Sequence, residues 1–129
     1  MLTFAILVQL LIMKKNKAHL QILNRSALIL RPLKPMEDWL NACTGKRVYD
    51  FSKAEPSVYL LEEYLDPDEG AAAWKSIYPS VFEQELGEWV ENPALWPADR
   101  SLSVFLDFFD VSLAGTVTDT IDTPFESYS

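Results

Sequence analysis

The chain has little cysteine and histidine: Cys43 and His19 are single residues of their kind among 129. One cysteine excludes an intramolecular disulfide and a zinc site built from the cysteines of one chain, and it fits a reducing compartment. A nucleophilic thiol needs a base nearby, whereas His19 precedes the first predicted strand. The sequence therefore predicts a cytoplasmic protein without a Cys–His catalytic pair or a metal site.

Glycine is also scarce, with four residues in the whole chain. The motifs Gly-x-Gly-x-x-Gly, Gly-x-Ser-x-Gly and His-Glu-x-x-His do not occur. Thr44-Gly45-Lys46 contains the Gly-Lys pair of a phosphate-binding loop, but it lacks the upstream glycine, and Arg47 follows where Ser or Thr is required. We expect no cofactor, and a nucleotide-binding enzyme is disfavoured.

Acidic residues are absent from residues 1–35, which carry six Lys or Arg, whereas residues 36–129 carry five basic and nineteen acidic residues. An acidic body repels phosphate backbones, and nucleic-acid affinity depends mainly on Lys and Arg. Direct binding of nucleic acid is therefore disfavoured. A basic protein partner, or solubility alone, accounts for this charge.

The apolar run at residues 1–13 is shorter than the roughly 20 residues that cross a bilayer. A secretory signal would carry its positive charge before the run, whereas here Lys14 and Lys15 follow it. Two interpretations stay open: a misplaced start, with the protein beginning at Met13, or a weak membrane segment. In the second case the lysines would keep the body cytoplasmic, and no membrane contact is expected for the body.

The composition, 49% apolar and 12% aromatic in 129 residues, is sufficient for one hydrophobic core. We expect a basic arm at 14–23, a single globular domain at 24–119 and a loose tail at 120–129, after the apolar extension at 1–13. The tail is polar and contains Pro124.

The first half of the predicted domain contains two strands and a helix. The apolar run at 25–31 is typical of a buried central strand. Pro35 favours a helix that runs to about Cys43 and ends at Gly45. The β-branched and aromatic run at 57–64 predicts a second strand.

The strongest local signal is a helix start at Asp66, with Pro67 at the first helical position and Glu69 placed to complete a capping box. An apolar stripe at three- and four-residue steps follows it. Proline breaks the helical hydrogen-bond ladder, so Pro79 predicts two helices, 67–77 and 79–91.

The last elements are a helix and a strand. Asp99 is placed to cap a helix with an apolar stripe formed by Leu102, Phe105, Leu106 and Phe109. Alternation over 111–118 predicts an edge strand. The fold class is therefore α+β: a small three-stranded sheet with helices packed on one face, in the order β-α-β-α-α-α-β.

Acidic residues gather on the long predicted helix, where Glu88 and Glu91 lie near Gln84, Glu83 and Glu85. Like charges repel on a helix surface, which suggests that a basic partner docks on this face or that paired carboxylates bind a metal there. The alternative is that the face is an ordinary solvated surface.

The proline-stiffened turn at 92–101 puts Trp96, Asp99 and Arg100 close together in sequence. Trp and Arg are enriched at binding hot spots, which makes these three residues candidates for a binding site. The alternative is structural: Trp96 fills the core, Asp99 caps the helix and Arg100 pairs with a surface acid.

Three segments together, Asn24-Arg-Ser-Ala27, Glu55-Pro-x-Val-Tyr-Leu60 and Pro93-Ala-Leu-Trp-Pro-x-Asp-Arg-Ser101, resemble a family of small uncharacterised bacterial proteins. The resemblance covers roughly residues 24–124. It implies a cytosolic bacterial domain that begins after the apolar run, and it implies no activity. Similar sequences often carry a histidine in the last strand near Ala114, which this chain lacks.

Two functions of different classes stay open. The first is a protein-interaction module without catalysis, with Glu88, Glu91, Trp96, Asp99 and Arg100 as binding residues and another protein or a second copy as partner. The second is a metal-dependent or hydrolase-like enzyme that uses carboxylates; its candidates are Glu62, Glu63 and Asp66, and their convergence in space is not readable from sequence.

Overall fold

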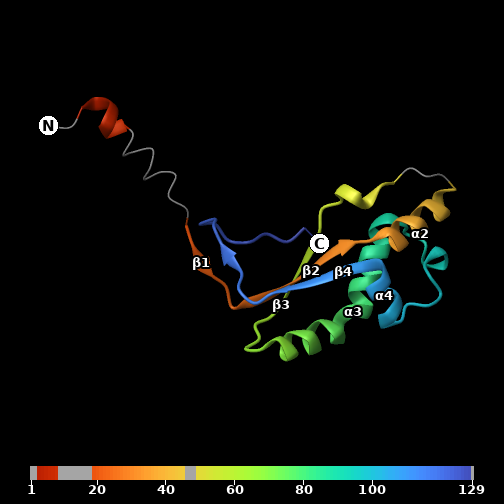
Figure 1. Cartoon of the computed structure of the whole chain (residues 1–129). Helices are drawn as coiled ribbons and strands as arrows, with labels where there is room; N and C mark the ends of the chain where they lie inside the picture. The colour runs from red at the N-terminus through yellow and green to blue at the C-terminus, as the bar shows by residue number, and fades with distance from the viewer. Residues whose placement is uncertain (1–2, 9–18, 46–48, 129) are drawn as a thin grey trace. The chain divides into compact units, whose positions relative to one another are not determined.

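The computed structural model describes residues 3–8, 19–45 and 49–128. It divides the chain into two compact units (Figure 1). The sheet unit is Asn24–Val117, and the terminal unit combines Met1–Leu23 with Thr118–Ser129. Each unit has a sheet of its own, and the sheet unit holds the hydrophobic core.

The sheet unit is built on three antiparallel strands in the order β3-β2-β4. The central strand β2 spans Arg25–Pro32, β3 spans Ser57–Glu62 and β4 spans Phe109–Ala114. Leu28 of β2 lies opposite Tyr59 on one side and Leu113 on the other. The predictions of a central first strand and of an edge strand at the end of the domain are confirmed.

The first helix, α2, spans Lys34–Thr44 and has proline in its first turn. Gly45 ends it at φ 70°, in the left-handed region that glycine enters without a Cβ clash. This agrees with the predicted stop. A short 3-10 turn, η1 (Phe51–Lys53), follows before β3.

One continuous helix, α3 (Pro67–Trp89), takes the place of the two helices predicted at 67–77 and 79–91. That prediction was wrong. Pro79 is exposed, so the carbonyl of Lys75 that it leaves unbonded can bind water. Trp74 before it and Phe82 after it are both buried in the same core, and this packing outweighs the local loss of one hydrogen bond.

The start of α3 agrees with the prediction in all but one detail. The Asp66 carboxylate accepts hydrogen bonds from the amides of Asp68 and Glu69, at 2.9 and 3.1 Å. In a capping box Glu69 would accept from the amide of Asp66, but it accepts from Leu65, at 3.1 Å.

Replacing Pro79 with alanine should raise the free energy of unfolding by about 1–3 kcal/mol, because alanine restores a helical N–H donor and removes the ring clash. Urea unfolding of both proteins measures the change. Pro67→Ala is the matched control, since proline is favourable at a first helical position, and it should bring no gain. A loss of stability in Pro79→Ala would contradict this account of α3.

The last helix, α4, spans Leu102–Phe108 and follows the 3-10 turn η2 (Pro93–Leu95). Its cap is Ser101, whose hydroxyl accepts from the amide of Val104, and not Asp99 as predicted. Asp99 lies two residues too early and accepts from the amide of Ser101. The predicted helical stripe also extended too far, because Phe109 already belongs to β4.

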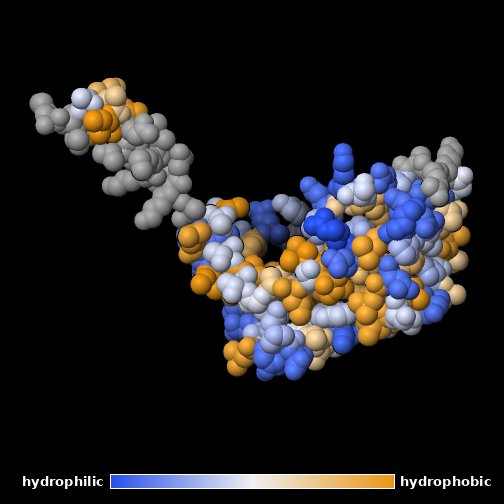
Figure 2. All heavy atoms as spheres, viewed as in Figure 1, coloured by the Kyte–Doolittle hydropathy of each residue, from blue (hydrophilic) through white to orange (hydrophobic). Residues whose placement is uncertain are grey.

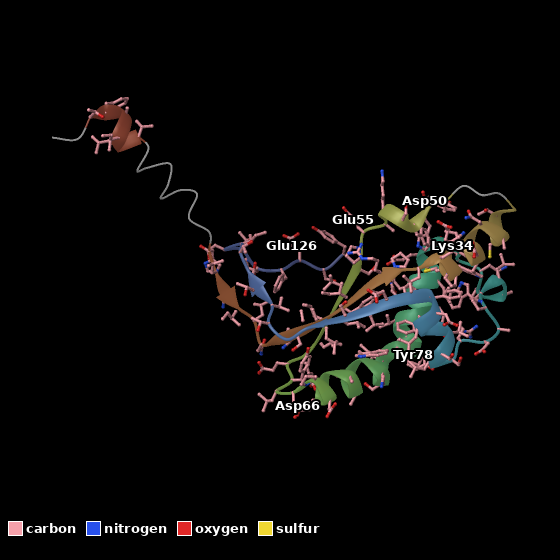
Figure 3. The ribbon with its side chains drawn as sticks, in the orientation of Figure 1. Lys34, Asp50, Glu55, Asp66, Tyr78 and Glu126 are labelled. Atoms are coloured by element: carbon pink, nitrogen blue, oxygen red, sulfur yellow. The ribbon has the colours of Figure 1, made fainter. Side chains whose placement is uncertain are left out.

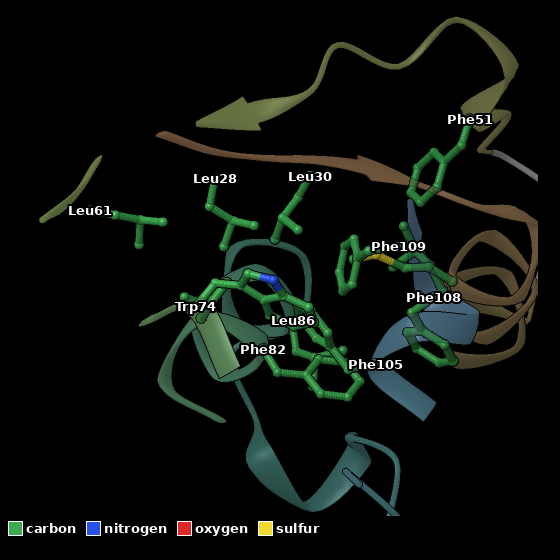
Figure 4. Close-up of a cluster of buried hydrophobic side chains, with 13 residues drawn as sticks. Leu28, Leu30, Phe51, Leu61, Trp74, Phe82, Leu86, Phe105, Phe108 and Phe109 are labelled. Atoms are coloured by element: carbon green, nitrogen blue, oxygen red, sulfur yellow. The ribbon is translucent and has the colours of Figure 1, made fainter. Parts of the chain in front are cut away.

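The core lies between the sheet and the helices (Figure 4). Leu28, Leu30 and Leu61 point from the strands toward Trp74, Phe82 and Leu86 of α3 and toward Phe105 of α4. On the opposite face of the sheet, Val58 and Leu60 stay about half exposed. The observed order in the sheet unit is β-α-β-α-α-β, one helix fewer than predicted.

The terminal unit pairs β1 (Gln21–Ile22) with β5 (Thr118–Asp119) in antiparallel register. This second sheet was not predicted: β1 lies in the expected basic arm, and Thr118 was assigned to the edge strand. Residues 4–8 are helical, and the rest of the apolar run lies outside the described residues. No helix in the described ranges is long and apolar enough to cross a membrane.

Candidate functional site

A cavity of about 580 Å³ opens in the sheet unit between η1 and the C-terminal half of α3. We call it the η1–α3 pocket. It is lined by residues of the segment 49–57, by one wall of α3 and by single residues of β2, α2 and β4: Pro32, Met36, Tyr49, Asp50, Phe51, Lys53, Ala54, Glu55, Ser57, Glu85, Glu88, Trp89 and Phe109.

Side chains of α2 hold the segment 49–51 at the pocket. The Asn41 amide group donates to the carbonyl of Tyr49 and accepts from its N–H, both at 3.0 Å. The Glu37 carboxylate accepts from the amide of Phe51 at 2.8 Å. The pKa of Glu37 is lowered by its ion pair with Lys34, at 2.7 Å, and by this hydrogen bond from the amide of Phe51. The pocket wall is therefore fixed by a charged carboxylate and an amide on the neighbouring helix.

Three aromatic rings form an apolar wall in the pocket. The ring of Trp89 lies 5.2 Å from that of Tyr49 at 75°, and 5.4 Å from that of Phe51 at 43°. Phe51 is buried, whereas Tyr49 and Trp89 are 37% and 46% exposed. The rings of Tyr49 and Trp89 are therefore partly accessible to a ligand, and the faces of aromatic rings attract cations.

Glu85 is the buried acid of the pocket, 5% exposed. Burial raises the pKa of its carboxyl group, and the negative charge of Glu88 one turn later raises it further. Hydrogen bonding by the hydroxyls of Ser57 and Tyr59 acts in the opposite direction. Burial and the same two carboxylates raise the pKa of Tyr59 far above its usual value, so its phenol keeps its proton at neutral pH.

The charges around the pocket are mainly negative. Four carboxylates line it, Asp50, Glu55, Glu85 and Glu88, against one cation, Lys53. Asp50 and Glu55 lie at the two ends of the η1 segment (Figure 3). Hydrogen bonds from Ser52 lower the pKa of Asp50, which keeps it ionised. A concave surface with this balance of charge attracts cations and repels anions.

Replacing Glu85 with glutamine should make the protein more stable at neutral pH, because burial in the folded protein disfavours the charged form of the Glu85 carboxyl group and so raises its pKa. Its folded pKa is raised above 4.5, so its contribution to stability is present below pH 4.5 and is lost as pH rises toward the folded pKa. Thermal unfolding of both proteins from pH 4 to 8 measures this. The gain should vanish near pH 4; an equal gain at every pH would contradict it.

The structure puts one residue predicted for the binding site, Glu88, in this pocket. Glu91 lies just past the end of α3 and is exposed. Its neighbour along the chain, the turn at 92–101, is not part of the lining. Of the residues that the sequence indicated for binding, Glu88 lines the pocket, and Glu91, Trp96, Asp99 and Arg100 do not.

Asp99 and Arg100 bond within their own turn, whereas Trp96 bonds to the residue that ends α3. The Trp96 indole donates to the carbonyl of Val90 at 2.7 Å and packs against the core. Arg100 lies 5.8 Å from the Trp96 ring and donates to the carbonyl of Pro97. The amide of Ser101 lowers the pKa of Asp99. The turn is therefore held by hydrogen bonds between its own residues and by the bond from Trp96 to the end of α3.

The carboxylates suggested for an enzyme, Glu62, Glu63 and Asp66, are exposed. Asp66 caps α3 and lies at the end of the helix away from Asp50 and Glu55 (Figure 3). Over the ranges that the structure describes, no group of three or more His, Cys, Asp or Glu is placed to hold a metal ion.

Sequence reasoning missed Glu85, Tyr49, Phe51 and Trp89 as a site. A signal for Glu85 was present: it stands three residues after Phe82 and four before Trp89, on the apolar stripe of the helix and not on its acidic face. A carboxylate on a core-facing stripe is a buried acid. Nothing comparable in the sequence indicated that residues 49–51 lie against α3.

No family model, curated protein or solved structure matches this chain. The resemblance to small bacterial proteins stays a prediction from three sequence segments.

Proposed function

We propose that the sheet unit is a binding module whose η1–α3 pocket takes a cationic group, such as the side chain of lysine or arginine in a protein partner. The observation that carries this proposal is the combination of four carboxylates and three aromatic rings around one cavity. An anionic pocket alone would collect small ions, and aromatic walls alone would collect apolar groups. Together they suit an organic cation.

Two energetic terms favour such a ligand. A cation over an aromatic face gains about 0.5–2 kcal/mol, with the larger values where water is excluded. Charge-assisted hydrogen bonds to the carboxylates add to this, and each is stronger than a neutral one. The acidic body, nineteen acids against five bases in residues 36–129, would also speed the approach of a basic partner.

A titration with n-butylammonium, the end group of lysine, tests the proposal on the full chain. The matched control is n-butanol, which has the same apolar chain and no charge. We expect n-butylammonium to bind with a Kd in about the millimolar range and to bind more weakly as salt increases. Equal binding of n-butanol, or no binding of the ammonium ion at 100 mM, would overturn the proposal.

Glu85 and Glu88 support a second candidate function, carboxylate acid–base catalysis in the same pocket. A buried carboxylic acid of raised pKa beside a second carboxylate is the arrangement in which one group donates and the other accepts a proton. Binding is the preferred function because the aromatic wall serves a cation directly. Turnover of a substrate that Glu85→Gln abolishes, without loss of binding, would favour catalysis.

A further inference from the structure

A second cavity, of about 430 Å³, adjoins the η1–α3 pocket. We call it the β3–α3 hollow. It lies between β3 and the middle of α3, with Val58, Tyr59, Ile77 and Val81 among its lining, and it shares Ser57 and Glu88 with the η1–α3 pocket. An anionic, aromatic pocket is therefore continued by a more apolar one along the start of β3.

The strand beside both cavities is an edge strand. In the described part of the chain β3 pairs with β2 alone. In antiparallel pairing every second residue turns its N–H and C=O away from the partner strand, so one side of β3 offers backbone groups to an added strand. Three consecutive residues of β3, Ser57 to Tyr59, line the hollow at this side.

We infer that the binding partner is an extended peptide that pairs with the free edge of β3, with a basic side chain in the η1–α3 pocket and an apolar side chain two residues away in the β3–α3 hollow. Side chains at i and i+2 of a strand point the same way and lie about 6.8 Å apart, which suits two adjoining cavities. The inference rests on the proposed function and adds the backbone and the second side chain.

Strand addition divides affinity and specificity in a way that fits these surfaces. Main-chain hydrogen bonds give the affinity, and pockets for alternate side chains give the specificity. The occupant is basic because the shared wall contains Glu88 and the adjoining pocket contains Asp50, Glu55 and Glu85. A peptide with acids at these positions would be repelled.

Two synthetic pentapeptides test the inference on the full chain: acetyl-Thr-Lys-Thr-Val-Thr-amide and acetyl-Thr-Val-Thr-Lys-Thr-amide, one for each direction along β3. We expect one of them to bind at least tenfold more tightly than n-butylammonium, and to lose that gain when its lysine is replaced by glutamine. If neither peptide exceeds the ammonium ion, the inference is overturned and the proposed function stands. If none of the three binds, both fall.

N-methylation of the better peptide tests backbone pairing directly. Lysine and valine direct their N–H groups to one side of the peptide strand, and the central threonine directs its own to the other side. One peptide is methylated at the backbone nitrogen of lysine and another at the backbone nitrogen of the central threonine. Only one of the two should lose affinity, by tenfold or more, because only one of these N–H groups faces β3. Equal losses, or no loss, would overturn strand pairing.

A protein variant separates the hollow from the pocket. Ser80 is exposed on α3 and lines the β3–α3 hollow only, so Ser80→Tyr should block the hollow and remove the peptide's gain while n-butylammonium binds as before. Ser76→Tyr, one turn earlier on the same helix, is the matched control and should change neither affinity. If the chain instead forms dimers that Ser80→Tyr dissociates and the peptides do not displace, the edge belongs to a second copy and the inference is overturned.

Discussion

Replacing Phe105 with alanine should lower the free energy of unfolding by about 3–5 kcal/mol. Phe105 is fully buried, and its ring lies 5.1–6.0 Å from the rings of Phe109, Phe82, Tyr78 and Trp74. Alanine would leave a cavity where α3, α4 and β4 meet. Domain stabilities are only about 5–15 kcal/mol, so this loss is large enough to leave the sheet unit partly unfolded at room temperature.

Urea unfolding followed by circular dichroism measures this change, and two matched variants give its scale. Phe105→Leu keeps most of the apolar volume and should cost less than half as much. Leu106→Ala on the same helix removes a side chain that is 44% exposed, and should cost about 1 kcal/mol or less. A loss below about 1 kcal/mol in Phe105→Ala would contradict the aromatic core.

Replacing Glu88 with lysine should weaken the binding of n-butylammonium at least tenfold. Glu88 lines both cavities, and the change turns a pocket of four carboxylates and one cation into one of three carboxylates and two cations. The ligand then meets a like charge at short range, where water screens it less than on the open surface. The loss should shrink in high salt.

Glu83→Lys is the matched control because it changes the net charge equally, on the same helix, at an exposed residue outside both cavities. It should alter the affinity less than about threefold, since a charge on the exposed surface acts through water of high dielectric constant and is screened by salt. Equal losses in the two variants would mean that the ligand responds to the general acidity of the body and not to this pocket.

The sheet and its core were predictable because the sequence carries them locally. The run at 25–31 has the length and apolar continuity of a buried strand, and Gly45 and Asp66 end and start helices at the expected residues. Sequence periodicity also predicts which large side chains are buried, such as Phe82 and Leu86. The surface is less regular, because apolar patches lie among polar ones on the face that Figure 2 shows.

The errors arose where tertiary contacts override local preference. Pro79 is tolerated because buried residues before and after it share one core, and no rule on proline alone contains that information. Pairing of β1 with β5 joins residues almost a hundred positions apart through two-residue strands, which are too short for a periodic signal.

The candidate site was largely unpredictable for a related reason. Glu88 was recognised as part of an acidic face, but its neighbours in the pocket come from segment 49–57, which the side chains of Asn41 and Glu37 hold in place. Such side chain–backbone bonds carry no sequence periodicity. Trp96 and Arg100 drew attention by residue type, but Trp96 bonds to Val90 at the end of α3 and Arg100 bonds to Pro97 of its own turn.

The most direct test of the central claim is to follow the four tryptophan indole N–H signals by NMR during titration with n-butylammonium. Trp89 lies in the η1–α3 pocket, whereas Trp39, Trp74 and Trp96 are outside its lining. The signal assigned to Trp89 by a Trp89→Phe variant should move with a saturable curve while the other three stay in place. Movement of the Trp96 signal with Trp89 fixed, or equal drift of all four, would contradict cation binding in this pocket.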